Sequence, residues 1–168
     1  MSGLPGVGKS AVADAIGRAL RAPVLAVDPI DAAMRQAGVG PDQPTGLAAY
    51  VVAEALTRHT LTLGVDVVVD AVNAVAPAQA QWIGVASDLD VPLRVVEVIC
   101  SDVDLHRARL AGRTRDLPGF PEPTWDTVQR IRAAFERWTV DRLLLDSTES
   151  HSRNVSRALA YVGVPLSA

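Results

Sequence analysis

The sequence is short of cysteine and of long hydrophobic runs, and both absences restrict where the protein works. Its one cysteine, Cys100, allows no internal disulfide, which is typical of a reducing compartment. No apolar stretch approaches the roughly 20 residues of a membrane span. The first residues lack the charged and apolar regions of a secretory signal. We therefore expect a cytoplasmic protein with no membrane contact.

An excess of positive charge is absent as well. The formal net charge is -3 at pH 7, whereas proteins that grip long nucleic acids usually carry a basic surface. The charge balance thus argues against a nucleic acid as the partner. Hydrophobic residues make up 49% and charged residues 21% of the chain, as in globular proteins. No repeat or linker divides the sequence, so we predict a single domain over residues 1–168.

Lysine is almost missing, because fifteen of the sixteen basic residues are arginine and the one lysine is Lys9. It lies in a segment that matches G-x-x-x-x-G-K-S, the pattern of a phosphate-binding loop. Glycines let the backbone N–H groups of such a loop surround phosphate oxygens, and the helix that follows adds its positive end. Lys9 would reach the β- and γ-phosphates, and Ser10 would coordinate Mg²⁺. The residues predicted to bind the nucleotide here are Gly3, Leu4, Pro5, Gly6, Val7, Gly8, Lys9 and Ser10.

The strand that normally precedes a phosphate loop is missing, because only Met1 and Ser2 stand before Gly3. The rest of the chain alternates strands with helices, which predicts an α/β fold with a parallel sheet covered by helices on both faces. Expected strands are 24–27, 66–70, 93–99 and 142–146; expected helices are 9–21, 30–37, 46–63, 77–88, 103–111, 124–138 and 152–162. The first, central strand is the missing one. We expect that the protein starts upstream with an apolar strand, and that the chain as written folds poorly or binds ATP weakly.

Two aspartates follow predicted strands at the edge of the sheet where ligands bind. Asp70 ends an apolar strand and is predicted to hold Mg²⁺ beside Ser10; the alternative is a cap for the next segment. Asp28 follows the strand 24–27 and could take the proton of an attacking hydroxyl; the alternative is a cap for a helix that starts at Pro29. Asp31 is a second candidate for the base.

A basic segment precedes a loop rich in proline and glycine, an arrangement typical of a lid that closes over ATP. We place this lid at about residues 105–124. Arg109 and Arg113 are four residues apart, so we expect them on one helix face, contacting phosphates. The alternative is a solvated basic face paired with Asp102, Asp104 and Asp116.

Together these motifs resemble the small phosphate-loop kinases, often described as AAA-family ATP-binding proteins. Their relatives include the kinase domain of polynucleotide kinase, chloramphenicol phosphotransferase and zeta toxins. The resemblance rests on Gly3–Ser10, Asp28, Val67–Asp70 with Asn73, and Arg109 with Arg113. It implies a three-layer P-loop NTPase fold with the loop strand at the centre of its sheet. It also implies ATP and Mg²⁺ as cofactors, Lys9, Asp28 and Arg113 in catalysis, and Ser10 and Asp70 at the metal.

The sequence departs from that family where an arginine usually follows the base by three residues, because Asp31 stands there instead. This loss of a cation on the substrate side favours a neutral or cationic hydroxyl compound. The function that we predict is transfer of the γ-phosphate of ATP to a hydroxyl of a small molecule. Two alternatives stay open, a nucleotide-binding module without catalysis (or a degenerate ATPase) and a nucleic-acid 5′-hydroxyl kinase. The sequence gives no indication of the oligomeric state.

Overall fold

The computed structural model of the protein describes residues 1–40, 42–115, 117 and 120–164. Helices and strands alternate along it, as the sequence predicts. In chain order the elements are α1 (Lys9–Leu20), β1 (Val24–Ala26), α2 (Val27–Gln36), α3 (Thr45–Thr62), β2 (Val68–Asp70), α4 (Ala76–Asp88), β3 (Val95–Ile99), α5 (Val103–Ala111), α6 (Trp125–Ala133), β4 (Arg142–Asp146) and α7 (His151–Val162). Within the described ranges, no helix combines the length and the apolar character needed to cross a bilayer.

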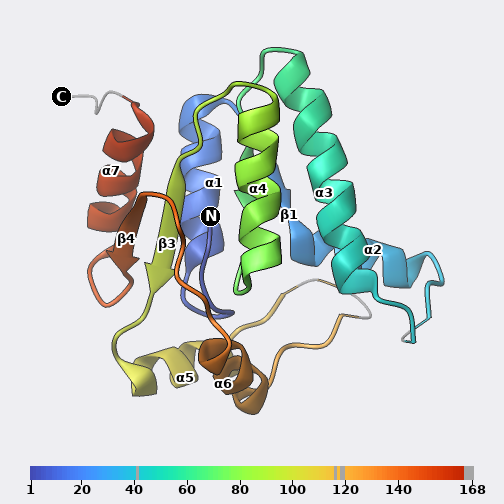
Figure 1. The fold of residues 1–168 in the computed structure, drawn as a ribbon. Coiled ribbons are helices and arrows are strands. Elements are labelled where there is room, and N and C mark those ends of the chain that lie inside the picture. The colour runs from blue at the N-terminus through green and yellow to red at the C-terminus, as the bar shows by residue number, and fades with distance from the viewer. Residues whose placement is uncertain (41, 116, 118–119, 165–168) are drawn as a thin grey trace.

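The elements form three layers, with the strands in the middle (Figure 1). On one face, α1 packs on β1 and β2 and against α7, which in turn contacts β4. On the other face, α3 lies over β1 and beside α4. The short helices α5 and α6 lie beyond the carboxyl end of β3 (Figure 1). This arrangement confirms the predicted α/β class with a parallel sheet between two helical layers.

The strands are paired in two parallel couples. β1 pairs with β2, with Val24 opposite Val68, and β3 pairs with β4, with Val95 opposite Arg142. Parallel strands covered on both faces are near-continuous apolar runs, and β3 has this character, since its first four residues are all buried. Both couples point their carboxyl ends to the same edge, where the phosphate loop lies (Figure 1).

The segment Met1–Gly3 lies between the two couples and joins them. The N–H of Ser2 donates to the carbonyl of Val96 at 2.9 Å. On the other side, the amine of Met1 donates to the carbonyl of Val69 at 2.6 Å. Ser2 pairs with β3 in the parallel sense. These residues therefore occupy the central position of the sheet, at the carboxyl ends of its neighbours.

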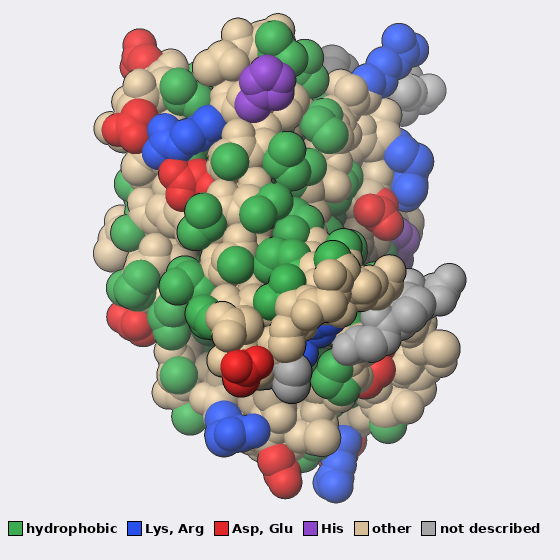
Figure 2. Space-filling view, turned by 90° about the vertical axis from the view of Figure 1, so that its right-hand side faces the viewer, with side chains coloured by type: hydrophobic (Ala, Val, Ile, Leu, Met, Phe, Trp, Pro, Cys, Tyr) green, Lys and Arg blue, Asp and Glu red, His purple; other side chains and the backbone are tan. Residues whose placement is uncertain are grey.

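The outward face of α3 carries an apolar stripe. Figure 2 shows hydrophobic side chains gathered on the side of the molecule that carries this helix. Leu47 and Val51, four residues apart, are 68% and 57% exposed, and Val52 and Leu56, also four apart, are 39% and 44% exposed. Residues four apart are neighbours on a helix surface. Their buried counterparts on α3, Ala49 and Ala53, pack toward the core.

Two predicted boundaries are wrong, each for a local reason. The strand 24–27 ends at Ala26, and α2 begins at Val27. Pro29 lies in the first turn of α2, where its missing N–H breaks no intrahelical hydrogen bond, so the helix can begin before it. The helix predicted over 124–138 ends at Ala133. Beyond it the chain turns back into the core, where Trp138 is buried at 6% exposure.

Candidate active site

The phosphate loop requires glycine at its first position. A Cβ atom on Gly3 would lie 2.3 Å from the carbonyl oxygen of Val98, closer than any side chain tolerates. Gly6 and Gly8 adopt φ values of 84° and 93°, in the left-handed region that glycine favours. Gly8 immediately precedes α1, so the loop runs directly into the N-terminus of that helix. Lys9 begins the helix and is only 4% exposed.

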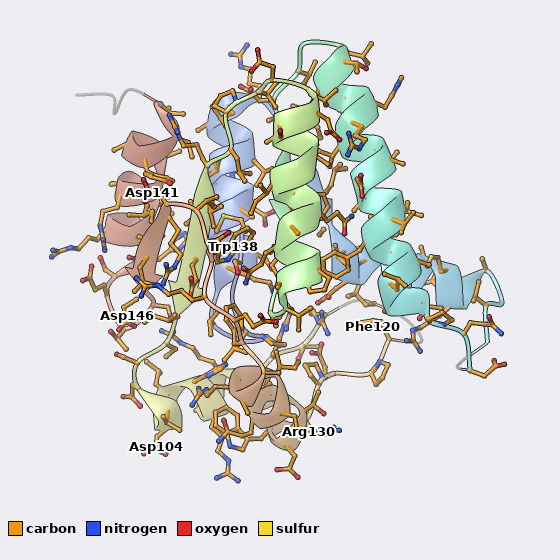
Figure 3. The ribbon with its side chains drawn as sticks, viewed as in Figure 1. Asp104, Phe120, Arg130, Trp138, Asp141 and Asp146 are labelled. Atoms are coloured by element: carbon orange, nitrogen blue, oxygen red, sulfur yellow. The ribbon has the colours of Figure 1, made fainter. Side chains whose placement is uncertain are left out.

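Side chains hold the two residues before the loop. The indole N–H of Trp138 donates to Oγ of Ser2 at 3.1 Å, and Trp138 lies between β3 and α4 (Figure 3). The amide nitrogen of Asn73 donates to the carbonyl of Met1 at 2.9 Å. The same Asn73 accepts at its oxygen from the indole N–H of Trp82 at 2.9 Å. The amino side of the loop is thus anchored by side-chain hydrogen bonds as well as by the sheet.

The two predicted aspartates lie at the carboxyl edge of the sheet. Asp70 is the last residue of β2, and Asp28 lies in the first turn of α2. Asp28 makes no side-chain cap for α2, so the capping alternative is wrong. Both carboxylates act electrostatically on the hydroxyl of Tyr50, whose pKa is raised, first by burial and then by these charges. Tyr50 also accepts a hydrogen bond from the backbone N–H of Asn73 at 3.1 Å.

The surroundings of Asp70 fit a cation. Its side chain is 6% exposed, and Oδ1 has no hydrogen-bond partner among the described residues. A buried carboxylate oxygen without a partner is costly, and a divalent cation would satisfy it. Among the described residues no cluster of three or more His, Cys, Asp or Glu side chains is present. Mg²⁺ at such a site is bound by few protein ligands, here Asp70 and Ser10, with phosphate oxygens and water completing its shell.

The lid brings Arg113 and Arg115 near the predicted base. Arg115 donates to Oδ2 of Asp28 at 2.6 Å and to Oε1 of Glu122 at 2.8 Å. Arg113 lies 4.0 Å from Glu122, and the charges of Asp28 and Asp70 also act on it. Burial lowers the pKa of Arg113, and the charge of Arg115 lowers it further. Two cations therefore approach the predicted base and metal ligand from the lid.

Each of these guanidinium groups has a nitrogen free for a ligand. One Nη atom of Arg113 and one of Arg115 are buried and have no hydrogen-bond partner within the described part of the chain. Buried donors without partners are rare in folded proteins, so each one requires an explanation. A ligand that accepts a hydrogen bond would provide it. Asp116, Pro118 and Gly119 of the predicted lid lie outside the described residues.

Arg109 lies elsewhere, and the expectation that it shares a helix face with Arg113 is wrong. α5 ends at Ala111 with Gly112 as its cap, so Arg113 lies beyond the helix. Arg109 stays on α5 and donates to the hydroxyl and the carbonyl of Ser147, at 2.9 and 3.1 Å. It therefore joins α5 to the loop after β4. The charge of Asp102 is used to cap α5 through the N–H of Leu105, not to pair with these arginines.

No arginine follows Asp28 by three residues, but another arginine of α2 lies further along the helix. Arg35, one turn after Asp31 on α2, bonds Asp31 at 3.0 Å and Thr45 at 3.0 Å. Phe120, a residue of the lid, lies near α2 (Figure 3). The guanidinium groups of Arg35 and Arg115 lie 5.6 and 5.1 Å from the centre of its ring. The region beside Asp28 therefore contains positive and negative side chains. Arg35 is paired with Asp31, and Arg115 is paired with Asp28 and Glu122.

His106 contacts the phosphate loop at Pro5. The sequence did not predict this contact. It is fully buried on α5, and its Nε2 lies 2.7 Å from the carbonyl oxygen of Pro5. Its Nδ1 lies 3.1 Å from a guanidinium nitrogen of Arg132 on α6. A guanidinium only donates, so Nδ1 is the acceptor and Nε2–H donates to the loop. Its ring also meets that of Trp125 edge-on, with centroids 5.2 Å apart.

Sequence reasoning missed Arg115, Arg35 and His106 for different reasons. Arg115 stands two residues after Arg113, and this doubled arginine is a visible signal within the lid. Arg35 follows Asp31 by four residues, the spacing of a helical ion pair. His106 gives no signal, because only the folded chain brings it under Pro5.

Comparison with known proteins agrees with this geometry. The AAA domain family matches residues 1–138. A sugar kinase from Janibacter sp. has a similar structure, with a TM-score of 0.69, 15% identity and coverage of 97% of this chain and 92% of that one. A gluconokinase from Sinorhizobium meliloti has a TM-score of 0.65 and 20% identity, with coverage of 96% of this chain and 88% of that one. The APS kinase CysC of Mycobacterium tuberculosis was solved with AMPPNP and APS. It has a TM-score of 0.58 and 22% identity, with coverage of 96% of this chain and 94% of that one.

The chain belongs to the AAA domain family, whose match covers most of its length. The solved structures share its fold at identities of 15–22%. No curated protein sequence matches it. The predicted resemblance to small phosphate-loop kinases is therefore confirmed at the level of family and fold.

Proposed function

We propose that the protein is a kinase that transfers the γ-phosphoryl group of ATP to a hydroxyl group of a small molecule, with Mg²⁺ as the metal. The observation that carries this proposal is that the charges of Asp28 and Asp70 both act on Arg113, while Oδ1 of Asp70 and one Nη atom of Arg113 have no hydrogen-bond partner among the described residues. The APS kinase neighbour, solved with AMPPNP, supports ATP as the nucleotide.

The loop and α1 would bind the nucleotide. The backbone N–H groups of Gly3–Ser10 surround the phosphate oxygens, and the side chain of Lys9 reaches the β- and γ-phosphates. Asp70 and the hydroxyl of Ser10 would hold Mg²⁺, which neutralises charge on the phosphates when bound. The free nitrogen of Arg113 would donate to the oxygens of the γ-phosphoryl group, where charge spreads as the transfer proceeds.

Asp28 would act as the base for the acceptor. As the acceptor oxygen forms its bond to the γ-phosphorus, the bond from that phosphorus to the β,γ-bridging oxygen breaks, and ADP leaves. The hydroxyl proton passes to the carboxylate of Asp28. Oδ2 of this group accepts from Arg115, and Oδ1 would take the proton. Arg115 would thereby orient the carboxylate.

The acceptor is a small molecule with several hydroxyl groups. The region beside Asp28 offers donors from Arg35 and Arg115 and acceptors from Asp31 and Glu122, each in an ion pair. A polyol presents donors and acceptors in the same alternation. Two of the structural neighbours are described as a sugar kinase and a gluconokinase, which supports this class.

The test is calorimetry of ATP with Mg²⁺, followed by ADP release with a library of sugars, sugar acids and other polyols. Asp28→Asn should leave ATP affinity within about twofold and lower kcat by a factor of about 10² or more, because only the proton transfer is lost. Asp14→Asn, at an exposed position of α1, is the matched control and should change neither. A module that binds ATP without catalysis would show no acceptor-dependent ADP release in any of the three proteins.

A further inference from the structure

The outward face of α3 is apolar, although the inward face of the same helix already packs on the core. Inward lie Ala49 and Ala53, which are fully buried. α2, α4 and β1 cover this inner side. Outward lie the exposed apolar side chains of α3 and of the residue that follows it, Leu47, Val51, Val52, Leu56 and Leu63. A helix that is apolar on all sides is normally covered on all sides, so the outer face of α3 suits a partner.

This face carries almost no ionisable groups. The structure describes α3 throughout, and its exposed residues are Gly46, Leu47, Ala48, Val51, Val52, Ala55, Leu56, His59 and Thr62. The two charged residues of the helix lie along one edge, where Arg58 donates to Glu54 and to Asp88 of α4 at 2.7 and 2.9 Å. Figure 2 shows hydrophobic side chains down the middle of this side of the molecule, with charged ones nearer its margins. An apolar patch with a polar rim is typical of an interface between proteins.

The face is complementary in shape to a second copy of itself in antiparallel orientation. A two-fold axis that crosses α3 between Ala55 and Leu56 places these two residues level with each other across the pair. The same axis places Ala48 of one helix level with Leu63 of the other. A small side chain therefore opposes a large one at both levels, which lets two helices pack closely.

The charged edge of the face favours the same arrangement. Such an axis brings each edge of the face against the same edge of the second copy, running in the reverse direction. Since Glu54 and Arg58 lie on either side of the axis, Glu54 of one copy comes beside Arg58 of the other. In a parallel pair the charged edge would instead meet the edge that carries Leu56 and Leu63, because these residues lie on the opposite side of the face. The charges are therefore complementary only in the antiparallel pair.

A lipid surface fits this face less well than a second copy does. Helices that lie on membranes usually carry several lysine or arginine residues on their polar side. α3 has one arginine, Arg58, and the carboxylates of Glu54 and Asp88 already neutralise it. The face thus offers no positive charge for anionic lipid.

We propose that the outward face of α3 is the interface of a two-fold symmetric dimer, in which α3 packs antiparallel against α3 of a second copy. Closed two-fold dimers are the commonest soluble oligomers, because one self-complementary patch serves both copies. An 18-residue helix is about 27 Å long and about 10 Å across. The buried area therefore lies at the low end of specific interfaces, and the dimer is reversible. This inference does not depend on the proposed kinase activity.

Sedimentation equilibrium over a series of protein concentrations tests whether the face associates. The unmodified chain should fit a monomer–dimer equilibrium. Val51→Glu should raise the dimer Kd at least about tenfold, because the interface would bury two new like charges. Ala160→Glu, at an exposed position of α7, is the matched control and should leave this Kd within about twofold. Circular dichroism of both variants checks that the fold is kept.

Cross-linking with a short bis-maleimide tests the orientation of the two helices. A mixture of Ala48→Cys and Thr62→Cys chains should cross-link, because the antiparallel pair brings these exposed positions to the same level. Neither variant alone should do so, since the two copies of each position would lie about 20 Å apart along the helices. The unmodified chain, whose one cysteine is the buried Cys100, is the control.

Three results would overturn the proposal. A chain that sediments as a monomer at every concentration up to about 100 µM would show that the face does not associate with itself. A dimer that Val51→Glu leaves unchanged would place the interface elsewhere on the molecule. Cross-linking of Ala48→Cys with itself, and not with Thr62→Cys, would show a parallel pair. In the first case, loss of binding to anionic lipid vesicles in Val51→Glu alone would identify a membrane as the occupant.

Discussion

Arg115 connects the lid to the candidate base more directly than any other residue of the site. Its guanidinium bonds Asp28 and Glu122 at once and lies over the ring of Phe120. The ion pair with Glu122 lowers the pKa of that carboxyl. Since Asp28 and Glu122 are about one third exposed, the pairs add little to stability. Their effect is to fix the position of Asp28 and of the lid relative to each other.

Replacement of Arg115 should therefore change acceptor binding rather than nucleotide binding. We expect Arg115→Ala to raise the acceptor KM about tenfold, the effect of losing a charged hydrogen bond of roughly 1.5–3 kcal/mol, while the Kd of ATP stays within twofold. Arg115→Lys should restore part of the loss. Steady-state kinetics and calorimetry give the two quantities, with Arg153→Ala, in an exposed ion pair on α7, as the control. An equal loss of ATP affinity would place Arg115 on the nucleotide side instead.

For single residues, the sequence predicts the position of those that belong to a local sequence motif. Gly3–Ser10 and Asp70 lie where their motifs place them, because a strand, a loop and a helix in sequence fix their own geometry. The pairing of Asp28 with Arg115 joins residues 87 positions apart. No local pattern contains such a contact, so it could not be predicted.

α5 and α6 form a support that couples the loop to the lid. His106 on α5 donates to the carbonyl of Pro5 and accepts from Arg132 on α6. Arg132 also lies over the ring of Trp125, 5.6 Å from its centroid. Burial lowers the pKa of His106, so the ring stays neutral at physiological pH and keeps its acceptor for Arg132. The side chain of His106 thus connects both helices to the phosphate loop.

Loss of this link should weaken both folding and nucleotide binding. His106→Phe keeps the ring volume but leaves the Pro5 carbonyl and Arg132 without their partner, so we expect a loss of about 1–3 kcal/mol in the free energy of unfolding. ATP affinity should also fall several-fold because the loop loses its support. Urea unfolding and calorimetry measure these, with His59→Phe, at an exposed position of α3, as the control. Unchanged ATP affinity would limit His106 to a structural role.

The elements themselves were largely predictable, and the exceptions are instructive. Strong periodicity located every helix and strand to within a few residues. α6 ends at Ala133 because the tertiary contact between Trp138 and Ser2 outweighs helical propensity. Arg113 leaves the helix face of Arg109 because α5 stops at Gly112. For α6 distant packing, which the local pattern does not contain, decides where the helix ends; for α5 the stop is the local glycine.

Across the whole molecule, the centre of the sheet is the weakest point. The sequence predicts an α/β fold with its central strand missing, and the structure places Met1–Gly3 there with only a short ladder on each side. The two couples of strands depend on this segment and on the helices that cover them. Asn73, Trp82 and Trp138 add side-chain hydrogen bonds that the sequence did not indicate.

The buried amine of Met1 makes the stability of the 168-residue chain depend on pH. Its pKa is about 6 in the folded protein, below the ordinary 8.0. The main cause is burial; Asp70 opposes the shift and Lys9 adds to it. Between pH 8 and 6 the unfolded chain binds more protons than the folded one, so stability falls as the pH falls. At 1.36 kcal/mol per unit, the full loss is roughly 3 kcal/mol.

Urea unfolding at pH 8.5 and pH 6 measures most of this loss. The matched control is the same chain acetylated at Met1, which keeps a nitrogen donor for the Val69 carbonyl but carries no charge. His106 is identical in the two proteins, so its own titration cancels in the comparison. We expect the acetylated chain to lose roughly 2 kcal/mol less than the free amine over this range. An equal loss in the two proteins would show that the amine of Met1 reaches water in the folded chain.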